Sequence, residues 1–337
     1  MPILDIFGEE FHDSEKKPRL ENKFAEELYD SQNRPRLNYA RSYFLGYSDR
    51  DPDLEGLKKY YVEWRDFNEY IVIQKQTDNL RIEGETDKVT IAVKCSKRGN
   101  PVYWSRVWKR IKKLYDLKEQ TLFDPHSSIK SSNVLFATLT YDTKRSTITE
   151  AWETEGRDFN KWIRNIRKKL GRIAYFRSLE ASKRGYPHIH ILMIFHDYEF
   201  KVVNIRGKYR ILEKEEFEKS WHSVVDVQAI RRFREGVRYV TKYLTKARNE
   251  SQTQVLTLAL SWLFRKRSFA ISGDMYELIQ ISIKHRKMIQ IDLNGEEIIL
   301  SEVWVFIGIF SAEKLGITHN EWWKTITDRK ILNEILT

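Results

Sequence analysis

The chain has 337 residues and almost no cysteine. Cys95 is its only cysteine, so an intramolecular disulfide and a zinc site built from several cysteines are both excluded. Proteins of the reducing cell interior typically lack disulfides, and we therefore expect an intracellular, cytoplasmic protein.

Long apolar runs are also missing. The most apolar stretches, residues 255–264 and 303–310, are well short of the ~18–20 residues that a membrane-spanning helix needs. The N-terminal sequence MPILDIFGEEF lacks the basic start and apolar core of a secretion signal. The sequence therefore predicts no membrane span and no secretion signal.

Positive charge is in excess. The chain has 59 Lys and Arg residues against 48 Asp and Glu residues, which gives a formal charge of +11. Its 10 Trp, 17 Tyr and 17 Phe residues add ring faces on which bases stack. Phosphates are attracted to such a surface, so the composition favours a polyanionic partner. A membrane surface or plain solubility would account for the same excess.

The hydrophobic pattern predicts an α+β fold with a central antiparallel sheet and flanking helices. A cluster of Pro, Asp, Ser and Asn at residues 123–133 marks a boundary before this unit. The expected strands cover residues 134–141, 172–180, 187–195, a hairpin at 202–212, and 224–230; the expected helices cover 147–170, 214–222 and 233–247. Upstream, residues 103–115 (YWSRVWKRIKKLY) predict a basic helix with a core stripe.

Two histidines flank an isoleucine in the expected strand 187–195. Because side chains alternate along a strand, His188 and His190 point to the same face, which makes a natural two-point metal site. The chain has eight histidines, and a pair at this spacing also arises by chance. Two structural histidines that are satisfied by hydrogen bonds are the alternative interpretation.

A carboxylate in the preceding strand supports the metal site. A hairpin whose turn is centred on Arg184 places Glu180 opposite His188. Glu180 then shares a face with both histidines, and two imidazoles with one carboxylate suit Mg²⁺ or Mn²⁺. A solvated cross-strand charge is the alternative for Glu180.

The segment YVTKYLTK, residues 239–246, lies in the expected helix 233–247. At about 100° per residue, one helix face carries four polar residues, Tyr239, Lys242, Tyr243 and Lys246, and the opposite face carries Val237, Val240 and Leu244. A phenol beside an ammonium group suits phosphate chemistry, with the phenol as nucleophile and the lysine as its charge partner. An amphipathic basic helix is the alternative.

Together these segments resemble the HUH endonuclease superfamily, in particular the two-tyrosine rolling-circle replication initiators of plasmids, single-stranded DNA phages and archaeal viruses. FATLTYD at 136–142 is similar to the first motif of that family, PHIHILMIF at 187–195 carries its histidine motif, and YVTKYLTK is similar to its tyrosine motif. Glu180 is placed like the family's additional carboxylate ligand. The histidines precede the tyrosines, as in initiators and unlike relaxases.

The resemblance implies an HUH nuclease fold and a metal-dependent DNA strand transferase. A Mg²⁺ or Mn²⁺ ion on Glu180, His188 and His190 would polarise the scissile phosphate of single-stranded DNA at a replication origin. Tyr239 or Tyr243 would attack it, forming a 5′-phosphotyrosine and a free 3′-hydroxyl that primes synthesis. No small-molecule cofactor is implied.

The resemblance also implies partners. Lys242 and Lys246 would assist phosphate binding. The chain has no G-x-x-x-x-G-K-[ST] segment, so we expect unwinding by a separate or host helicase or by supercoiling, and synthesis by a host polymerase.

The expected organisation has three parts. An HUH endonuclease domain at 126–250 lies between an N-terminal accessory region at 1–125 and a C-terminal accessory region at 251–337. A transposase of the same nuclease class and a non-catalytic origin-binding or repressor protein are the alternatives. The long flanking regions favour an initiator over a minimal transposase, and the intact motifs argue against a non-catalytic protein.

The basic excess predicts that binding to non-cognate DNA weakens steeply with salt, because bound Lys and Arg displace counterions from the phosphates. The measurement is the slope of log affinity against log salt concentration. A slope near zero would show that the positive charge serves solubility instead.

Overall fold

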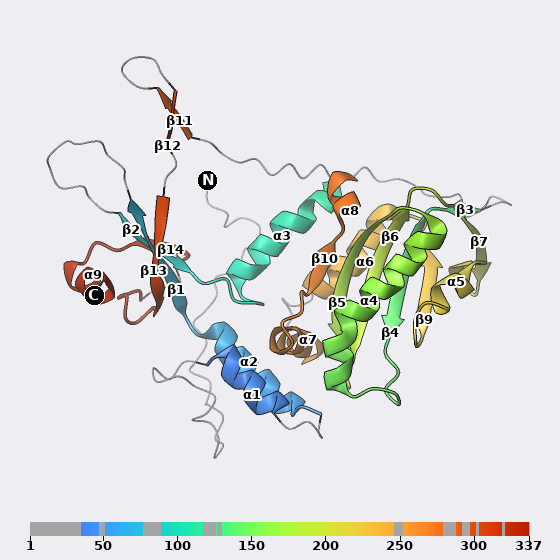
Figure 1. Ribbon diagram of the computed structural model, residues 1–337, viewed down its shortest axis with the longest axis horizontal. Coiled ribbons are helices and arrows are strands. Elements are labelled where there is room, and N and C mark those ends of the chain that lie inside the picture. Colours follow the sequence, from blue (N-terminus) through green and yellow to red (C-terminus); the bar gives the residue numbers. More distant parts are fainter. Residues whose placement is uncertain are drawn as a thin grey trace.

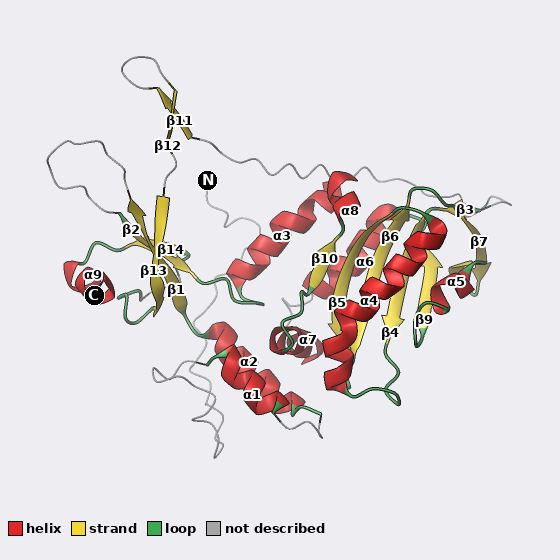
Figure 2. Ribbon diagram, in the orientation of Figure 1, coloured by secondary structure: helices red, strands yellow, loops and turns green. Residues whose placement is uncertain are grey.

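The protein combines helices with antiparallel sheets (Figures 1 and 2), which confirms the predicted α+β class. A computed structural model describes residues 35–46, 51–76, 89–116, 126, 130–245, 252–278, 288–291, 297–300, 303–318 and 321–336.

A five-stranded sheet forms the centre of the larger part of the molecule. Its strand order is β10-β5-β6-β4-β9, and all neighbouring strands are antiparallel. The strands are β4 (Val134–Thr140), β5 (Ile173–Ala181), β6 (Pro187–Phe195), β9 (Val225–Ala229) and β10 (Phe269–Ile271). The first four of these confirm predicted strands. β10 follows residue 250, so the C-terminal region also contributes to this sheet.

The turn between β5 and β6 sets the register of the two strands. The backbone N–H of Ser182 donates to the carbonyl of Tyr186 at 2.8 Å, and that of Gly185 donates to the carbonyl of Ser182 at 2.9 Å. Gly185 has φ = 90°, a conformation that favours glycine because it has no Cβ. In the resulting register Glu180 lies opposite His188, as the sequence predicts.

Helices cover both faces of the central sheet (Figures 1 and 2). One face packs against α4 (Ile148–Leu170) and α7 (Gln252–Leu263). The other packs against α3 (Pro101–Asp116), α6 (Phe233–Thr245) and α8 (Gly273–Leu278). Because side chains alternate, odd-numbered strand residues such as Leu139 enter the first core and even-numbered ones such as Leu192 enter the second.

The helix α4 begins with a capping box. The Thr147 hydroxyl accepts from the Glu150 N–H at 3.2 Å, and the Glu150 carboxylate accepts from the Thr147 N–H at 2.8 Å. The helix buries Trp152 and Trp162 against the sheet. The indole N–H of Trp152 donates to the carbonyl of Gly185 at 2.7 Å, so α4 also holds the β5–β6 turn.

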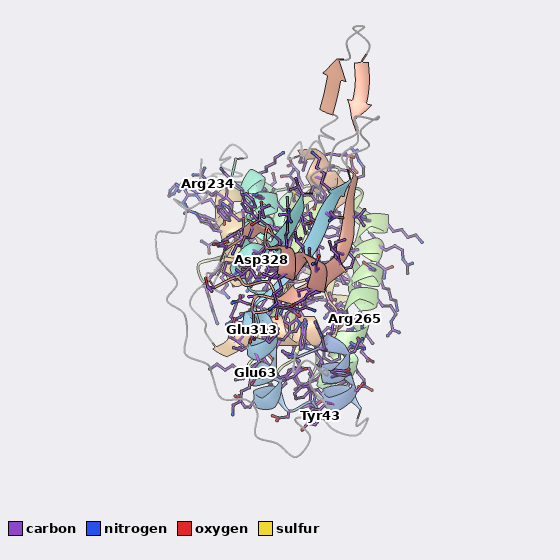
Figure 3. The ribbon with its side chains drawn as sticks, turned by 90° about the vertical axis from the view of Figure 1, so that its left-hand side faces the viewer. Tyr43, Glu63, Arg234, Arg265, Glu313 and Asp328 are labelled. Atoms are coloured by element: carbon purple, nitrogen blue, oxygen red, sulfur yellow. The ribbon has the colours of Figure 1, made fainter. Side chains whose placement is uncertain are left out.

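Two N-terminal helices join this core. α1 (Leu37–Leu45) and α2 (Leu54–Asp66) pack against α7. Arg41 donates to the carbonyl of Leu263 at 2.5 Å. Arg265, labelled in Figure 3, donates to Asn38 at 2.9 Å.

Segments from both ends of the chain form a second antiparallel sheet, in the order β13-β1-β2-β14. Its strands are β1 (Glu69–Gln76), β2 (Thr90–Lys94), β13 (Val303–Ser311) and β14 (Trp323–Thr325), and α9 (Arg329–Leu336) closes its small core. The phenol of Tyr70 donates at 2.8 Å to the carbonyl of Glu321, which is 251 residues further along the chain. This sheet was not among the elements predicted from the sequence.

The remaining elements are short. A three-stranded sheet contains β3 (Ser131–Ser132), β7 (Phe200–Ile205) and β8 (Lys208–Ile211), and a separate hairpin contains β11 (Met288–Ile291) and β12 (Glu297–Leu300). The short helix α5 (Lys214–Glu218) follows β8. The structure confirms four predicted helices, α3, α4, α5 and α6, and the predicted hairpin of β7 and β8. No helix in the described part of the chain is both long enough and apolar enough to cross a membrane.

The capping box predicts that Thr147→Ala lowers the free energy of unfolding by about 1 kcal/mol, because the first turn of α4 loses a hydrogen-bond acceptor. Urea unfolding measures the change. Thr147→Ser keeps the hydroxyl and is expected to remain close to wild type; equal losses in both variants would contradict the capping role.

Candidate functional site

One end of the sheet face that α6 covers is polar. It carries Thr138 and Thr140 on β4, Glu180 on β5, and His188 and His190 on β6. In the register of the sheet, Thr138 lies opposite His190, Thr140 lies opposite His188, and Glu180 lies opposite His188 from the other side. The three predicted ligand residues are therefore neighbours on a single face, as the alternation of their strands requires.

Threonines of β4 orient both imidazoles. The Nδ1 atom of His190 lies 3.2 Å from the Thr138 hydroxyl, and the Nδ1 atom of His188 lies 3.3 Å from the Thr140 hydroxyl. A hydroxyl both donates and accepts, so it holds the ring in either tautomer. Both rings consequently turn their Nε2 atoms away from β4.

The carboxylate of Glu180 contacts the histidine that lies diagonally across from it. One oxygen of Glu180 is 2.9 Å from Nε2 of His190, which is 5% exposed, although the backbone partner of Glu180 is His188. The Glu180 side chain is 27% exposed, so the contact lies at the edge of the buried region. The carboxylate of Glu180 and the imidazole of His190 therefore lie within hydrogen-bond distance of each other.

Burial lowers the pKa of His188 below its usual value. The neighbouring His190 lowers it further, and the Glu180 carboxylate partly opposes the shift. His188 is therefore neutral at neutral pH. A neutral imidazole has the free lone pair that metal coordination requires.

The side chain of Tyr239 lies over this end of the sheet. Its ring meets the ring of Phe136 edge-on at a centroid distance of 4.5 Å, and the ring of His190 at 6.3 Å and 80°. Tyr239 is 41% exposed, whereas Val237 and Val240 of the same helix are fully buried. The helix thus presents this phenol beside the histidines, with its valines in the core, as its sequence pattern predicts.

Several contacts hold α6 close against the sheet. The Ser178 hydroxyl of β5 donates to the carbonyl of Val240 at 3.3 Å, and the hydroxyls of Thr241 and Tyr115 are in hydrogen-bond contact, which joins α6 to α3. A Cβ at Gly236 would come within 2.6 Å of Ile230 and 2.8 Å of Leu192. Glycine at this position therefore permits the close approach of the helix.

The structure describes the other predicted residues of this segment to different extents. Lys242 is exposed on the same helix. The backbone of Tyr243 belongs to α6, but its side chain lies outside the described part of the structure, and Lys246 lies outside the described residues altogether. The roles of Tyr243, Lys242 and Lys246 stay predictions.

Residues 134–248 match the family model described as Replication-associated protein ORF2/G2P. We call residues 134–248 the matched segment. No curated protein and no solved structure is significantly similar to the chain.

The limits of the matched segment coincide with structural boundaries. The match begins at the first residue of β4 and ends shortly after α6, so it includes Glu180, His188, His190 and Tyr239. It covers about one third of the chain. The helices α1 to α3, the strand β10 and the second sheet all lie outside it.

The matched segment carries two imidazoles and a carboxylate on one sheet face, but the described residues contain no group of three or more His, Cys, Asp or Glu side chains that could hold a metal ion. The nature of the donors fits a divalent ion, since two imidazoles that turn Nε2 outward lie next to a carboxylate. The threonine hydroxyls contact Nδ1, the ring nitrogen through which a histidine that binds a metal by Nε2 makes its outer hydrogen bond. The ligand role of Glu180, His188 and His190 stays a prediction.

Thr138, Thr140 and Phe136 had no individual role predicted from the sequence. A signal was present, because TLT in residues 138–140 has the same alternation as HIH in residues 188–190. In an antiparallel pair of strands these two segments can lie opposite each other, as they do here. The motif that resembles the family's first motif therefore supports the histidines from the neighbouring strand.

We predict that the protein binds Mn²⁺ and that His188→Ala with His190→Ala weakens this binding at least about ten-fold, because both nitrogen ligands are lost. Isothermal titration calorimetry measures the affinity. His196→Ala, at an exposed position just after β6, is the matched control and is expected to bind like wild type. Unchanged binding by the double variant would contradict the ligand assignment.

Proposed function

We propose that the chain initiates rolling-circle replication as an HUH-type endonuclease that nicks and rejoins single-stranded DNA at an origin. The position of Tyr239 beside His190, within a segment that matches the replication-associated family, carries this proposal. A nucleophilic phenol, a carboxylate and two imidazoles on one exposed sheet end are the groups that such a transesterification needs.

Tyr239 acts as the nucleophile. Its phenol oxygen bonds to the scissile phosphorus as the bond from phosphorus to the 3′ oxygen breaks, the phenol proton leaves to solvent, and the departing 3′ oxygen takes up a proton. The product is a 5′-phosphotyrosine with a free 3′-hydroxyl. Because one ester bond replaces another, the link conserves the bond energy for rejoining, in which the same steps run in reverse.

Glu180, His188 and His190 would hold the Mg²⁺ or Mn²⁺ ion, which supplies Lewis acidity at the phosphate when bound. The chain's own contribution is orientation. Thr138 and Thr140 hold the imidazole rings, and burial keeps His188 neutral by lowering its pKa.

Exposed basic side chains on α6 and on α3, which packs against it, support a DNA substrate. The helix α3 buries Val107, Ile111 and Leu114 in the same core as Val237 and Val240 of α6. Its opposite side exposes Arg106, Lys109, Arg110 and Lys112, and none of these four takes part in an ion pair within the described residues. Lys242 of α6 is exposed as well. These cations offer sites for backbone phosphates.

A second tyrosine, one helical turn from Tyr239, would allow a second strand-transfer step. Tyr243 follows Tyr239 by four residues in α6, and in a helix positions four residues apart share one side. A second transesterification at Tyr243 would end replication within the same site. A separate or host helicase and a host polymerase would supply unwinding and synthesis.

A transposase of the same nuclease class would use the same chemistry on other DNA ends, and a non-catalytic origin-binding protein would retain only the fold. The arrangement of Tyr239, His190 and Glu180 supports a catalytic protein over the second alternative. The replication-associated match supports an initiator over a transposase.

Nicking is predicted to require both histidines and a divalent ion. His188→Ala with His190→Ala should abolish cleavage of single-stranded oligonucleotides that tile the origin, yet keep much of the DNA affinity. Robust cleavage by this variant, or by wild type in excess EDTA, would exclude the metal mechanism.

Phenylalanine variants test the nucleophile, because they keep the ring and remove only the oxygen. Tyr239→Phe with Tyr243→Phe should form no covalent protein–DNA band on a denaturing gel. Each single variant should retain some cleavage or one of the two half-reactions, with Tyr239 making the first cut.

Tyr39→Phe is the matched control, since this exposed tyrosine lies on α1, outside α6 and outside both the histidine site and the pocket beside Tyr239. A covalent band from the double variant would refute the proposed nucleophiles. Full loss in Tyr243→Phe alone, with wild-type behaviour of Tyr239→Phe, would show that Tyr243 is the sole nucleophile.

A further inference from the structure

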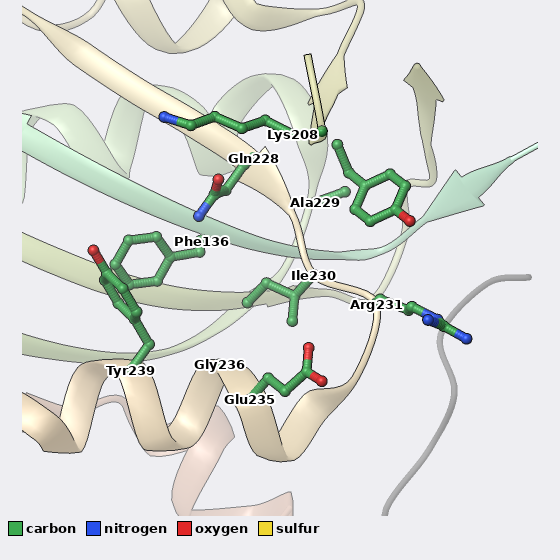
Figure 4. Close-up of a pocket in the computed structure, with 11 residues that line it drawn as sticks. Phe136, Lys208, Gln228, Ala229, Ile230, Arg231, Glu235, Gly236 and Tyr239 are labelled. Atoms are coloured by element: carbon green, nitrogen blue, oxygen red, sulfur yellow. The ribbon is translucent and has the colours of Figure 1, made fainter. Parts of the chain in front are cut away.

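A pocket of about 400 Å³ opens beside Tyr239 (Figure 4). Three elements form its walls: the tip of the β7–β8 hairpin, the end of β9 and the first turns of α6. Phe136 and Tyr239 close one end. Glu180, His188 and His190 do not line it, so the pocket is distinct from the histidine site although both border Tyr239.

The end of the pocket nearest Tyr239 suits a planar aromatic ligand. Tyr239, which is 41% exposed, offers its ring there and meets the buried ring of Phe136 edge-on, and Tyr209 contributes a further ring to the lining. Ring faces of this kind stack with bases at about 1–3 kcal/mol per base. The volume lies within the usual range for small-molecule sites, roughly 300–1,000 Å³, and is sufficient for one nucleotide.

One polar side chain is placed to recognise such a ligand. Gln228 of β9 lies opposite Phe136 in the sheet register, and Figure 4 shows its amide directed toward the rings of Phe136 and Tyr239. This amide makes no hydrogen bond to any other described residue, and the side chain is half-buried. An amide that offers one donor and one acceptor side by side is suited to the hydrogen-bonding edge of a base.

The rim of the pocket is basic. Lys208 is exposed at the hairpin tip, and Arg231 lies at the end away from Tyr239 (Figure 4). The Nε atom of Arg231 is buried without a hydrogen-bond partner in the described structure. The acid in the lining, Glu235, has Arg232 within 4.0 Å. The balance of charge favours an anionic ligand such as a phosphodiester.

We propose that this pocket binds one unstacked base of the single-stranded DNA next to the phosphate that Tyr239 attacks, and that Gln228 selects the base. The inference rests on the proposed function and extends it to the source of sequence preference. Sequence-specific recognition of single strands commonly uses splayed bases that stack on aromatic rings and hydrogen-bond along their edges. Lys208 and Arg231 would bind the flanking phosphates.

Fluorescence anisotropy with labelled dA12, dC12 and dT12 and an abasic 12-mer tests the proposal. Wild type should separate the strongest and weakest of the three homopolymers by roughly 5-fold or more, the lower limit for a bidentate amide–base contact. Gln228→Leu should reduce this ratio to about two-fold or less, and it should leave binding of the abasic strand unchanged.

Two further variants distinguish base recognition in the pocket from a general effect on DNA binding. Gln228→Glu retains the shape but loses the donor, so it should change the order of preference among the homopolymers. Gln74→Leu, a similar change on β1 of the second sheet, is the matched control and should preserve the wild-type ratio.

Equal affinities of wild type for all three homopolymers, or an unchanged ratio in both Gln228 variants, would overturn the assignment. The covalent-adduct assay is scored in parallel. If Gln228→Leu still forms the adduct and keeps the wild-type ratio of homopolymer affinities, base recognition by the pocket is refuted and the proposed function is not. If wild type forms no adduct, the proposed function itself is refuted.

Discussion

The register of the β5–β6 hairpin is the constraint on which the site depends. A shift by one residue would turn Glu180 or both histidines to the opposite face, where α4 and α7 fill the core. The Gly185 turn and the Trp152 contact to its carbonyl hold this register. The same pairing continues into β4, whose threonines orient the imidazoles, so three strands together define the position of the donor atoms.

The site also depends on the close approach of α6 to the sheet. Buried Val237 and Val240 attach the helix to the same core as α3, and Gly236 allows close contact with Leu192. Tyr239 therefore lies at the polar end of the sheet, where its ring is near that of His190 and also lines the pocket that carries Gln228.

Local patterns made the centre of the fold and most of the site predictable. The alternation in residues 187–195, the turn SKRGY and the 3.6-residue period of α4 and α6 are properties of short segments, and each is confirmed. The second sheet was not predictable, because Tyr70 meets Glu321 and no local pattern encodes a pairing over 251 residues. The pocket also escaped prediction, since Lys208, Gln228 and Tyr239 come from three separate elements.

The central claim is that a tyrosine of α6 becomes covalently linked to DNA, and peptide mapping of the wild-type adduct tests it most directly. Trypsin cleaves after Arg238, Lys242 and Lys246, so Tyr239 and Tyr243 fall in two different peptides, YVTK and YLTK. After nuclease trimming, mass spectrometry should find the nucleotide remnant on YVTK in the first-cut product. A remnant found only on a peptide from outside α6 would contradict the account.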